Sequence, residues 1–346
     1  MRGYILKMDK NKKNMIMNLL LITVISIIVI FLLLNNNLNE MLPLLKNINI
    51  KYLILCLIIV FIWQLLIGIS LTIFSRIIKK DYKISQGFLN ALVATLFNGI
   101  TPSATGGQIA QAFVFNKQGL NAGDAISVLW TEFIMYQSTM CLFGLFLIIL
   151  KLKFFLTEYS NLFILVIFGF ILNSAVIVGL ILLAKFNKFQ DFIFTKGINI
   201  AYKLHLIKDK VSTTNYINEQ LSNFRKEANN LIHHKKEFII CCILCIFRLT
   251  AYYSIPFIIF IALGIKPNLD IFIDCLSMGS FVAIASNLIP IPGASGGTEL
   301  IFIQMFAHIF GPLNAKTAVL LWRFFTYYLL LLVGFIAYAY YKFKEN

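Results

Sequence analysis

The same short motif, rich in proline and glycine, occurs twice inside long uncharged stretches of the chain. The first copy reads Asn98-Gly-Ile-Thr-Pro-Ser-Ala-Thr-Gly-Gly107 and the second reads Asn287-Leu-Ile-Pro-Ile-Pro-Gly-Ala-Ser-Gly-Gly297. Proline removes a backbone donor and paired glycines permit positive φ, so a helix must break at both places. Irregular backbone of this kind is stable at membrane depth only when it is buried in protein or lines a cavity.

The composition identifies the surroundings of the two motifs as a membrane. The chain is 59% hydrophobic and only 13% charged, which is too apolar for a soluble domain and indicates a polytopic membrane protein. The net charge of +15 suggests nucleic acid, but the basic residues flank apolar runs, where membrane sorting already explains them. We therefore expect no nucleic-acid partner.

Six runs are long enough to cross a bilayer at 1.5 Å per residue. They are Ile16 to Leu34, Tyr52 to Phe74, Ala125 to Leu150, Asn161 to Ala184, Phe238 to Ile265 and Thr317 to Tyr341. The first lacks a small-residue cleavage site, so it is expected to remain as an uncleaved span rather than a signal peptide. The chain is thus predicted to be an all-α polytopic protein with one membrane domain over residues 1–346.

The segments that contain the two motifs do not fit as ordinary spans. Residues 84–115 carry no charge over 32 positions, which is too short for two comfortable crossings and too broken for one. A re-entrant hairpin fits this length, and the second motif predicts another. The distribution of Lys and Arg, 22 on one side and six on the other, places both termini in the cytoplasm. The first hairpin then enters from the cytoplasm and the second from outside, so residues 52–150 and 238–341 form inverted repeats.

Residues 185–237 form the one substantial polar segment, with ten Lys or Arg among 53 residues. Apolar residues recur in it at helical spacing and predict an amphipathic helix. They are Ile217, Leu221, Phe224, Ala228 and Leu231. Packing on the cytoplasmic face of the bundle, binding to anionic lipid and pairing with a partner helix are three open interpretations.

We single out four charged residues inside the predicted membrane segments: Glu132, Arg248, Glu299 and Arg323. Each costs about 2.5 to 3.5 kcal/mol to insert, so such residues usually face a partner or a water-filled cavity. Glu132 and Arg323 follow the two motifs at similar distances, which predicts that they meet at the centre. We expect Glu132 to reach Arg248 or Arg323. A purely structural ion pair is the alternative interpretation.

The two breaks also predict a site for an anion. New half-helices are expected to begin at Gln108 and Thr298, and helix N-termini present free N–H groups and partial positive charge. The predicted lipid- or anion-binding residues are Asn98, Thr101, Pro102, Gly106, Gly107, Gln108, Glu132, Arg248, Asn287, Pro292, Gly296, Gly297, Glu299 and Arg323. Glycines that merely allow close helix packing are the alternative. We find no catalytic constellation, metal site, nucleotide motif or other cofactor site in the sequence.

The segments Asn98 to Gln108 and Pro290 to Glu299 resemble the two signature segments of the lysylphosphatidylglycerol synthase transmembrane-region family of flippase-like integral membrane proteins. The resemblance covers about Tyr52 to Tyr341. Family members that make lysyl-phosphatidylglycerol carry a soluble domain after the membrane region, which takes lysine from lysyl-tRNA. The present sequence ends five residues after Tyr341, so the resemblance implies lipid translocation more directly than aminoacyl transfer.

We therefore expect a flippase of the bacterial cytoplasmic membrane that moves an anionic phospholipid or a polyprenyl-phosphate-like lipid. One alternative is a phosphatidylglycerol lysyltransferase, linked to resistance against cationic antimicrobial peptides and acting with a separate synthase partner. Another is a small-anion transporter. The expected partners are an anionic membrane lipid, a separate synthase or a second copy of the chain.

Overall fold

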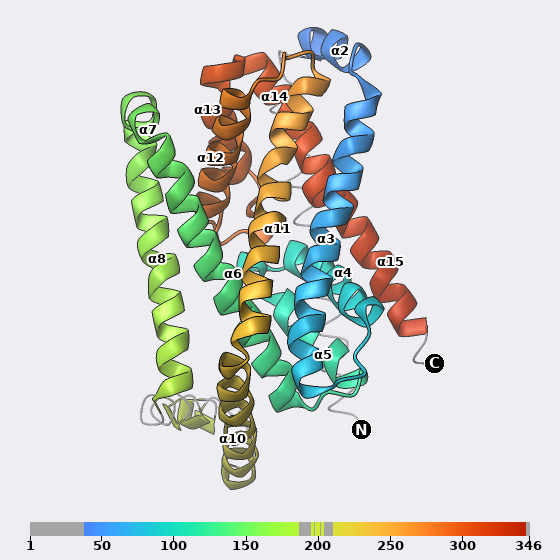
Figure 1. The fold of residues 1–346 in the computed structure, drawn as a ribbon, viewed down its shortest axis with the longest axis vertical. Helices are drawn as coiled ribbons and strands as arrows, with labels where there is room; N and C mark the ends of the chain where they lie inside the picture. The colour runs from blue at the N-terminus through green and yellow to red at the C-terminus, as the bar shows by residue number, and fades with distance from the viewer. Residues whose placement is uncertain (1–37, 187–194, 197, 201, 204–209, 344–346) are drawn as a thin grey trace.

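The computed structural model describes residues 38–186, 195–196, 198–200, 202–203 and 210–343, and every regular element in these ranges is helical. Figure 1 shows a bundle whose long helices run along one common axis. The expected all-α architecture is confirmed.

Five of the six predicted spans correspond to long helical segments of the bundle (Figure 1). They are α3 (Ile50–Ile78), α6 (Ala122–Leu150), α8 (Ser160–Lys185), α11 (Lys235–Ala262) and the interrupted segment made of α14 (Pro312–Arg323), the π-helical η3 (Phe324–Tyr328) and α15 (Leu329–Phe343). The remaining predicted span, Ile16 to Leu34, lies outside the described residues.

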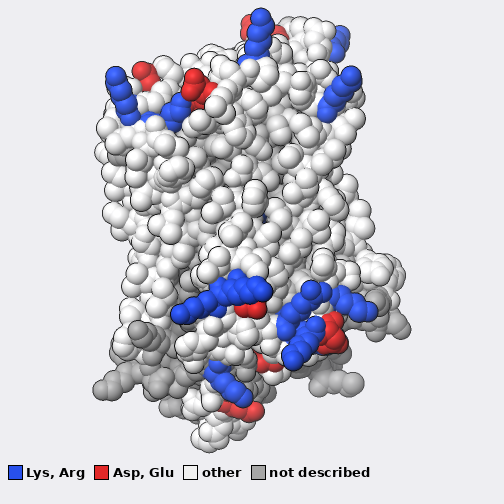
Figure 2. Space-filling view, in the orientation of Figure 1, with Lys and Arg blue, Asp and Glu red and all other residues white. Residues whose placement is uncertain are grey.

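The surface of the bundle is that of a multi-pass membrane protein. Large apolar side chains point outward along the long helices, among them Leu142 on α6 and Phe335 on α15. Figure 2 shows Lys, Arg, Asp and Glu gathered toward the two ends, with an uncharged belt between them. Apolar side chains gain nothing by exposure to water, so this belt is the surface that faces lipid.

Each motif forms the tip of a helical hairpin. The first hairpin consists of α4 (Ile84–Ile100), the short η1 (Pro102–Ala104) and α5 (Gly106–Lys117). The second consists of α12 (Leu269–Ser286), η2 (Pro292–Ala294) and α13 (Gly297–Phe310). The tips η1 and η2 contact each other near the middle of the bundle (Figure 1).

The first hairpin returns to the end of the bundle from which it starts. Lys79, in the loop between α3 and α4, donates from Nζ to the backbone oxygen of Gln118 at 2.8 Å, just after α5. The Gln118 side chain in turn donates to Gln86 O at 3.0 Å. Tyr82 in the same loop donates to Gln118, and its burial raises the pKa of the phenol, which keeps it protonated as a donor.

The second hairpin starts and finishes at the opposite end. Two contacts hold it beside α7 (Leu152–Glu158) and its flanking residues. Lys151 lies 2.8 Å from Asp274 in α12, and the Tyr159 hydroxyl donates to Met305 O in α13 at 2.6 Å. The two hairpins therefore start and finish at opposite ends of the bundle.

Glycines let α4 pack closely between two spans. A Cβ on Gly68 of α3 would lie 2.6 Å from Phe88 Cα, and one on Gly334 of α15 would lie 2.8 Å from Leu92 O. Both distances are too short for any side chain, so α4 is held at nearly backbone contact on two sides. The first hairpin is thereby fixed against α3 and α15.

Two further helices lie at the ends of the bundle. Helix α2 (Leu38–Lys46) packs near α14, whereas α10 (Lys210–His233) lies at the opposite end and packs against α6. Of the predicted apolar row in α10, Ile217 is half-buried, and the side chains of the other four residues lie outside the described part. The contact between α10 and α6 favours packing on the bundle over the other two interpretations of residues 185–237.

The hairpin arrangement predicts which positions share a side of the membrane. In a background without the six native cysteines, Gln86→Cys and Asn116→Cys should react with an impermeant maleimide added to one side only. Asp270→Cys and Asn314→Cys should react only from the other side. Reaction of either pair from opposite sides would contradict the hairpins.

Candidate functional site

The two breaks begin with the same backbone path and diverge at Thr105, which is helical, and Ser295, which is extended. The residue before the proline is extended in each, with φ and ψ of −116° and 146° at Thr101 and −109° and 143° at Ile291. The two residues after each proline then have positive φ. The values are 51° at Ser103 and 53° at Ala104 in the first break, and 61° at Gly293 and 49° at Ala294 in the second. Positive φ costs a non-glycine residue on the order of 1–2 kcal/mol, so the surroundings must hold the break in place.

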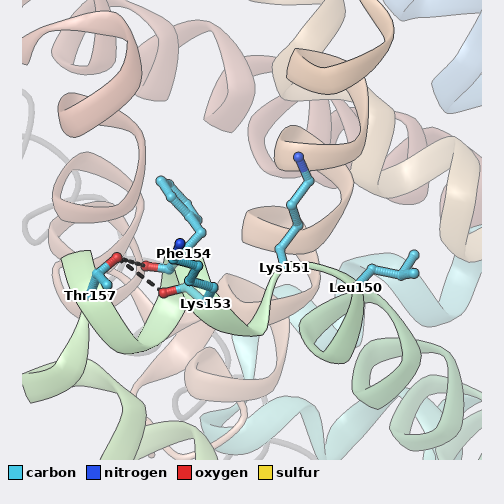
Figure 3. Close-up of a pocket in the computed structure, with 5 residues that line it drawn as sticks. All are labelled: Leu150, Lys151, Lys153, Phe154 and Thr157. Atoms are coloured by element: carbon cyan, nitrogen blue, oxygen red, sulfur yellow. Dashed lines mark hydrogen bonds between the residues drawn. The ribbon is translucent and has the colours of Figure 1, made fainter.

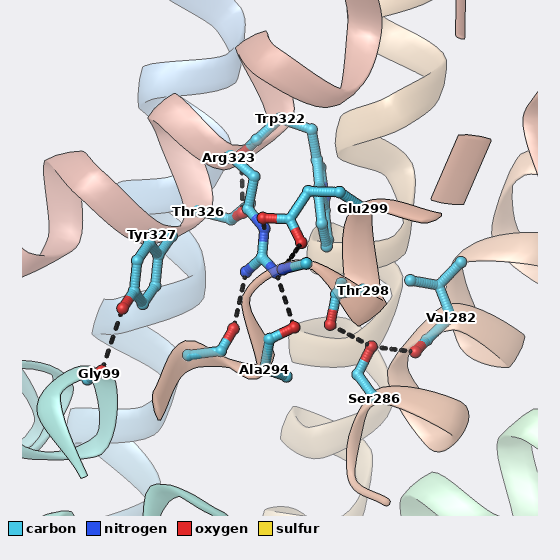
Figure 4. Close-up of polar contacts among 12 residues, drawn as sticks. Gly99, Val282, Ser286, Ala294, Thr298, Glu299, Trp322, Arg323, Thr326 and Tyr327 are labelled. Carbon is cyan, nitrogen blue, oxygen red and sulfur yellow. Dashed lines mark hydrogen bonds and ion pairs between the residues drawn. The ribbon is translucent and has the colours of Figure 1, made fainter. Parts of the chain in front are cut away.

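An arginine braces the second break (Figure 4). Arg323, the last residue of α14, donates to the backbone oxygens of Gly293 at 3.1 Å and Ala294 at 3.5 Å. Its Nε lies 2.8 Å from Glu299 Oε1, in an ionic contact whose N–H does not point at that oxygen. The two side chains are only 8% and 4% exposed. Arg323 thus satisfies the carbonyls that the positive-φ turn leaves unpaired.

The two half-helices that follow the breaks are capped differently. Glu299 accepts a hydrogen bond from the Gly296 N–H at 2.7 Å, so the N-terminus of α13 already holds a carboxylate. At the N-terminus of α5 the Gly106 N–H donates to the Thr101 hydroxyl at 2.8 Å, and Thr101 donates to Phe97 O. The first half-helix therefore has a neutral cap and the second an anionic cap.

Two glycines of the motifs lie in close contact with neighbouring side chains. A Cβ on Gly107 would lie 2.0 Å from Oδ1 of Asn98, which packs against it. Gly293 has a φ of +61°, and a Cβ there would lie 2.4 Å from the ring of Tyr327. The glycines therefore allow both the turn and the close approach of neighbouring side chains.

A second buried ion pair joins α6 to α11. Arg248 donates from a terminal nitrogen to Glu132 Oε1 at 2.7 Å, and its guanidinium lies 4.2 Å from the centre of the Tyr136 ring. Glu132 thus reaches Arg248, one of its two predicted partners. Its predicted meeting with Arg323 is not observed, because Arg323 turns toward the second break and pairs with Glu299.

Aromatic residues connect the ion pairs and the breaks. Tyr252 lies one turn after Arg248 on α11, and its ring lies 4.7 Å from Trp63 and 6.2 Å from Trp322. The Tyr327 hydroxyl donates to Gly99 O at 3.0 Å and so ties the π-helical segment to the first break (Figure 4). Both charge pairs and both tips therefore belong to one contiguous centre.

The predicted site residues divide by exposure. The first break is open, since all residues from Pro102 to Thr105 are exposed. Of the predicted site residues, Pro102, Gln108 and Asn287 are exposed, Gly107, Pro292, Glu299 and Arg323 are buried, and Asn98, Thr101, Gly106, Glu132, Arg248, Gly296 and Gly297 are intermediate. The second break is the enclosed one, and Ser295 Oγ inside it is buried with no hydrogen-bond partner in the described part of the chain.

A separate pocket of about 330 Å³ lies at the turn between α6 and α7 (Figure 3). Its polar groups are used locally: Thr157 donates to backbone oxygens within its own helix, and Lys151 pairs with Asp274. It lies at one end of the bundle, apart from both breaks, and does not extend the candidate site. Among the described residues, no three His, Cys, Asp or Glu gather to hold a metal ion.

Sequence reasoning missed three tyrosines in this centre. Tyr136, Tyr252 and Tyr327 each follow a predicted charged residue by four positions, after Glu132, Arg248 and Arg323. Residues four apart lie on the same face of a helix, so each tyrosine points toward the surroundings of its charge. This spacing was the signal that could have identified them.

The comparisons with known proteins identify one family. The family described as "Lysylphosphatidylglycerol synthase TM region" matches residues 18–334, which include both breaks and all four charged residues of the centre. A search among curated proteins finds no match to the chain.

The buried pair between α6 and α11 predicts a difference between two conservative substitutions. Glu132→Gln leaves Arg248 uncompensated and should lower the free energy of unfolding by about 3–5 kcal/mol. Glu158→Gln removes a carboxylate that faces His308 at 3.1 Å on the exposed surface and should cost less than about 1 kcal/mol. Thermal unfolding of both purified variants in one detergent measures this, and equal losses would contradict a special role for the buried pair.

Proposed function

The chain belongs to the lysylphosphatidylglycerol synthase transmembrane-region family, and we propose that it moves an anionic lipid between the leaflets of the bacterial cytoplasmic membrane. The lipid is a phospholipid or a polyprenyl-phosphate-like molecule whose headgroup crosses at the centre of the bundle. Its acyl chains stay in the surrounding bilayer. In this proposal both termini of the protein lie in the cytoplasm.

The observation that carries this proposal is the meeting of two broken hairpins from opposite ends, with irregular backbone exposed at the first tip. Pro102 to Thr105 are exposed near the middle of an apolar bundle. The turn pairs the N–H groups of Ala104 and Thr105 with Thr101 O and Pro102 O, and hydrocarbon does not satisfy the polar groups that remain, whereas water or a polar headgroup does. The first break therefore supplies the polar surface that a crossing headgroup requires.

The second break supplies the positive charge. Arg323 and the N-terminus of α13 both bind anions by their chemistry, and both are engaged by the Glu299 carboxylate in this conformation. In our proposal the lipid phosphate exchanges with Glu299 on these two groups. The buried Ser295 hydroxyl beside them adds a neutral donor. Glu299 then acts as the internal anion that keeps the site neutral when no lipid is bound.

Passage of a headgroup requires the two tips to separate. The tips η1 and η2 contact each other, and the hydrogen bond from Tyr327 to Gly99 O ties the last span to α4 just before the first tip. That bond is a neutral contact worth about 0.5–1.5 kcal/mol. The residues with positive φ on both sides of this contact are places where the chain can bend without unfolding a helix. This supports movement of the second hairpin against the first, which glycine contacts fix to α3 and α15, as one repeat moves against the other in transporters built from inverted repeats.

The family description names a synthase, so lysine transfer is the activity to be distinguished from translocation. Aminoacyl transfer from tRNA needs a soluble surface that holds a large polyanion and an activated ester. The longest polar segment of the sequence, residues 185–237, is shorter than a folded domain of typical size. This favours translocation as the activity of the membrane region.

Reconstitution of the purified chain tests the proposal. In liposomes it should accelerate the movement of a fluorescent anionic lipid between leaflets, and it should make no lysyl-phosphatidylglycerol when lysyl-tRNA is supplied. Lysine incorporation by the chain alone would replace the proposal with the synthase activity. Movement no faster than in protein-free liposomes would remove the basis for translocation.

Arg323→Ala should slow the movement by at least about tenfold, since a hydrogen bond to a charged group contributes about 1.5–3 kcal/mol. Lys153→Ala is the matched control, because it removes one exposed cation at the end of the bundle. Arg323→Lys keeps the charge but not the planar fork, and intermediate activity is expected. Equal rates for Arg323→Ala and Lys153→Ala, in protein of normal thermal stability, would exclude Arg323 from the path.

A further inference from the structure

A groove of about 490 Å³ lies on the first hairpin, between α4, α5 and α15. Val93 and Phe97 of α4 and Tyr338 of α15 line it, together with one face of α5. Ile109 and Phe113, two of its α5 residues, are 61% and 69% exposed. The groove is therefore open sideways to the surface that faces lipid.

The length and position of the groove match one leaflet of a bilayer. Its lining runs from Gly106, at the first break, to Lys117, the last residue of α5. These eleven steps correspond to about 16 Å of helix, about half of a hydrocarbon core of roughly 30 Å. One end of the groove thus reaches the centre of the bundle and the other reaches the end of the bundle where α5 finishes.

The two ends of the groove differ in chemistry from its walls. Asn116, Lys117 and Tyr341 stand at the outer end, and Lys342 follows Tyr341 directly. The neighbouring loop between α3 and α4 adds Lys79, Lys80 and Lys83 against a single acidic residue, Asp81. An apolar trough with a basic mouth is complementary to an acyl chain that carries a phosphate at one end.

We propose that this groove seats one acyl chain of an anionic lipid from the adjoining leaflet, with the lipid phosphate beside Asn116 and Lys117. The inner end of the seated chain lies at Gly106, next to the exposed Thr105 and Gln108 of the first break. The groove is then the position from which a lipid enters the centre. Only this last step depends on the proposed translocation, because occupancy by an anionic lipid is measurable without transport.

Photo-crosslinking of the full-length protein tests the occupant. We would place p-benzoylphenylalanine at Phe113, inside the groove, and at Phe335, an exposed residue of α15 outside its lining. The protein would be reconstituted in liposomes of phosphatidylglycerol and phosphatidylcholine in equal amounts, and lipid adducts would be identified by mass spectrometry. The Phe113 probe should capture phosphatidylglycerol about fivefold in excess of phosphatidylcholine. The Phe335 probe should capture both in the bulk ratio.

The basic mouth provides the matched variants. Lys117→Ala should bring the ratio at Phe113 down to that of the bulk lipid, whereas Lys117→Arg should preserve the excess. If the Phe113 probe captures phosphatidylglycerol and phosphatidylcholine in the bulk ratio while Lys117 is present, the proposal is overturned. Peptide adducts to residues 16–34 or to a second copy of the chain would also overturn it, because the groove would then be filled by protein.

A variant in which a side chain fills the groove distinguishes the proposed lipid seat from the proposed function. Ala110→Trp places a large side chain in the groove and should abolish the phosphatidylglycerol excess at Phe113. If the unsubstituted protein moves lipid, Ala110→Trp should slow the movement, and an unchanged rate would exclude the groove as the entry position. If it moves none, the phosphatidylglycerol excess still establishes the lipid seat while the proposed function fails.

Discussion

Backbone hydrogen bonding in a medium without water is the constraint on which this structure depends. A helix satisfies its own backbone, but the two breaks expose carbonyl and N–H groups near mid-depth. The chain satisfies them with side chains that come from other elements: Arg323 of α14 bonds two carbonyls of the second break, and Tyr327 bonds Gly99 O beside the first. The interrupted last span therefore stabilises both hairpins.

The two breaks begin with the same backbone turn but differ in chemistry. Thr101 gives the first half-helix a neutral cap, and Glu299 gives the second a charged one. The first tip is exposed and the second is enclosed. An anion at the centre would meet the exposed first tip on one side and a braced carboxylate and guanidinium on the other. The repeat thus produces two unlike halves of one site rather than two equal sites.

The architecture was predictable because its signals are local. Uncharged length identifies the spans, and proline with paired glycines identifies the breaks. The partners of the charges were harder to predict, because distance along the chain does not say which helix faces which. Equivalence within the repeat suggested Glu132 with Arg323, whereas Glu132 bonds Arg248 and Arg323 bonds Glu299. Glu299 lies three residues after Gly296, the spacing of a capping box, and this spacing rather than its charge indicates where its carboxylate binds.

The π-helical segment in the last span has a mechanical consequence. A π turn contains one residue more than an α turn, and η3 separates α14, which holds Arg323, from α15, which lines the groove. Transfer of that extra residue along the helix would rotate α15 by about 100° and shift it by about 1.5 Å, while α14 stays still. Tyr338 and Tyr341 would then leave the groove and Gly334 would leave its close contact with Leu92 of α4, while Arg323 keeps its bonds to the second break. A single span can in this way reshape the lipid-facing wall and keep the charged centre intact.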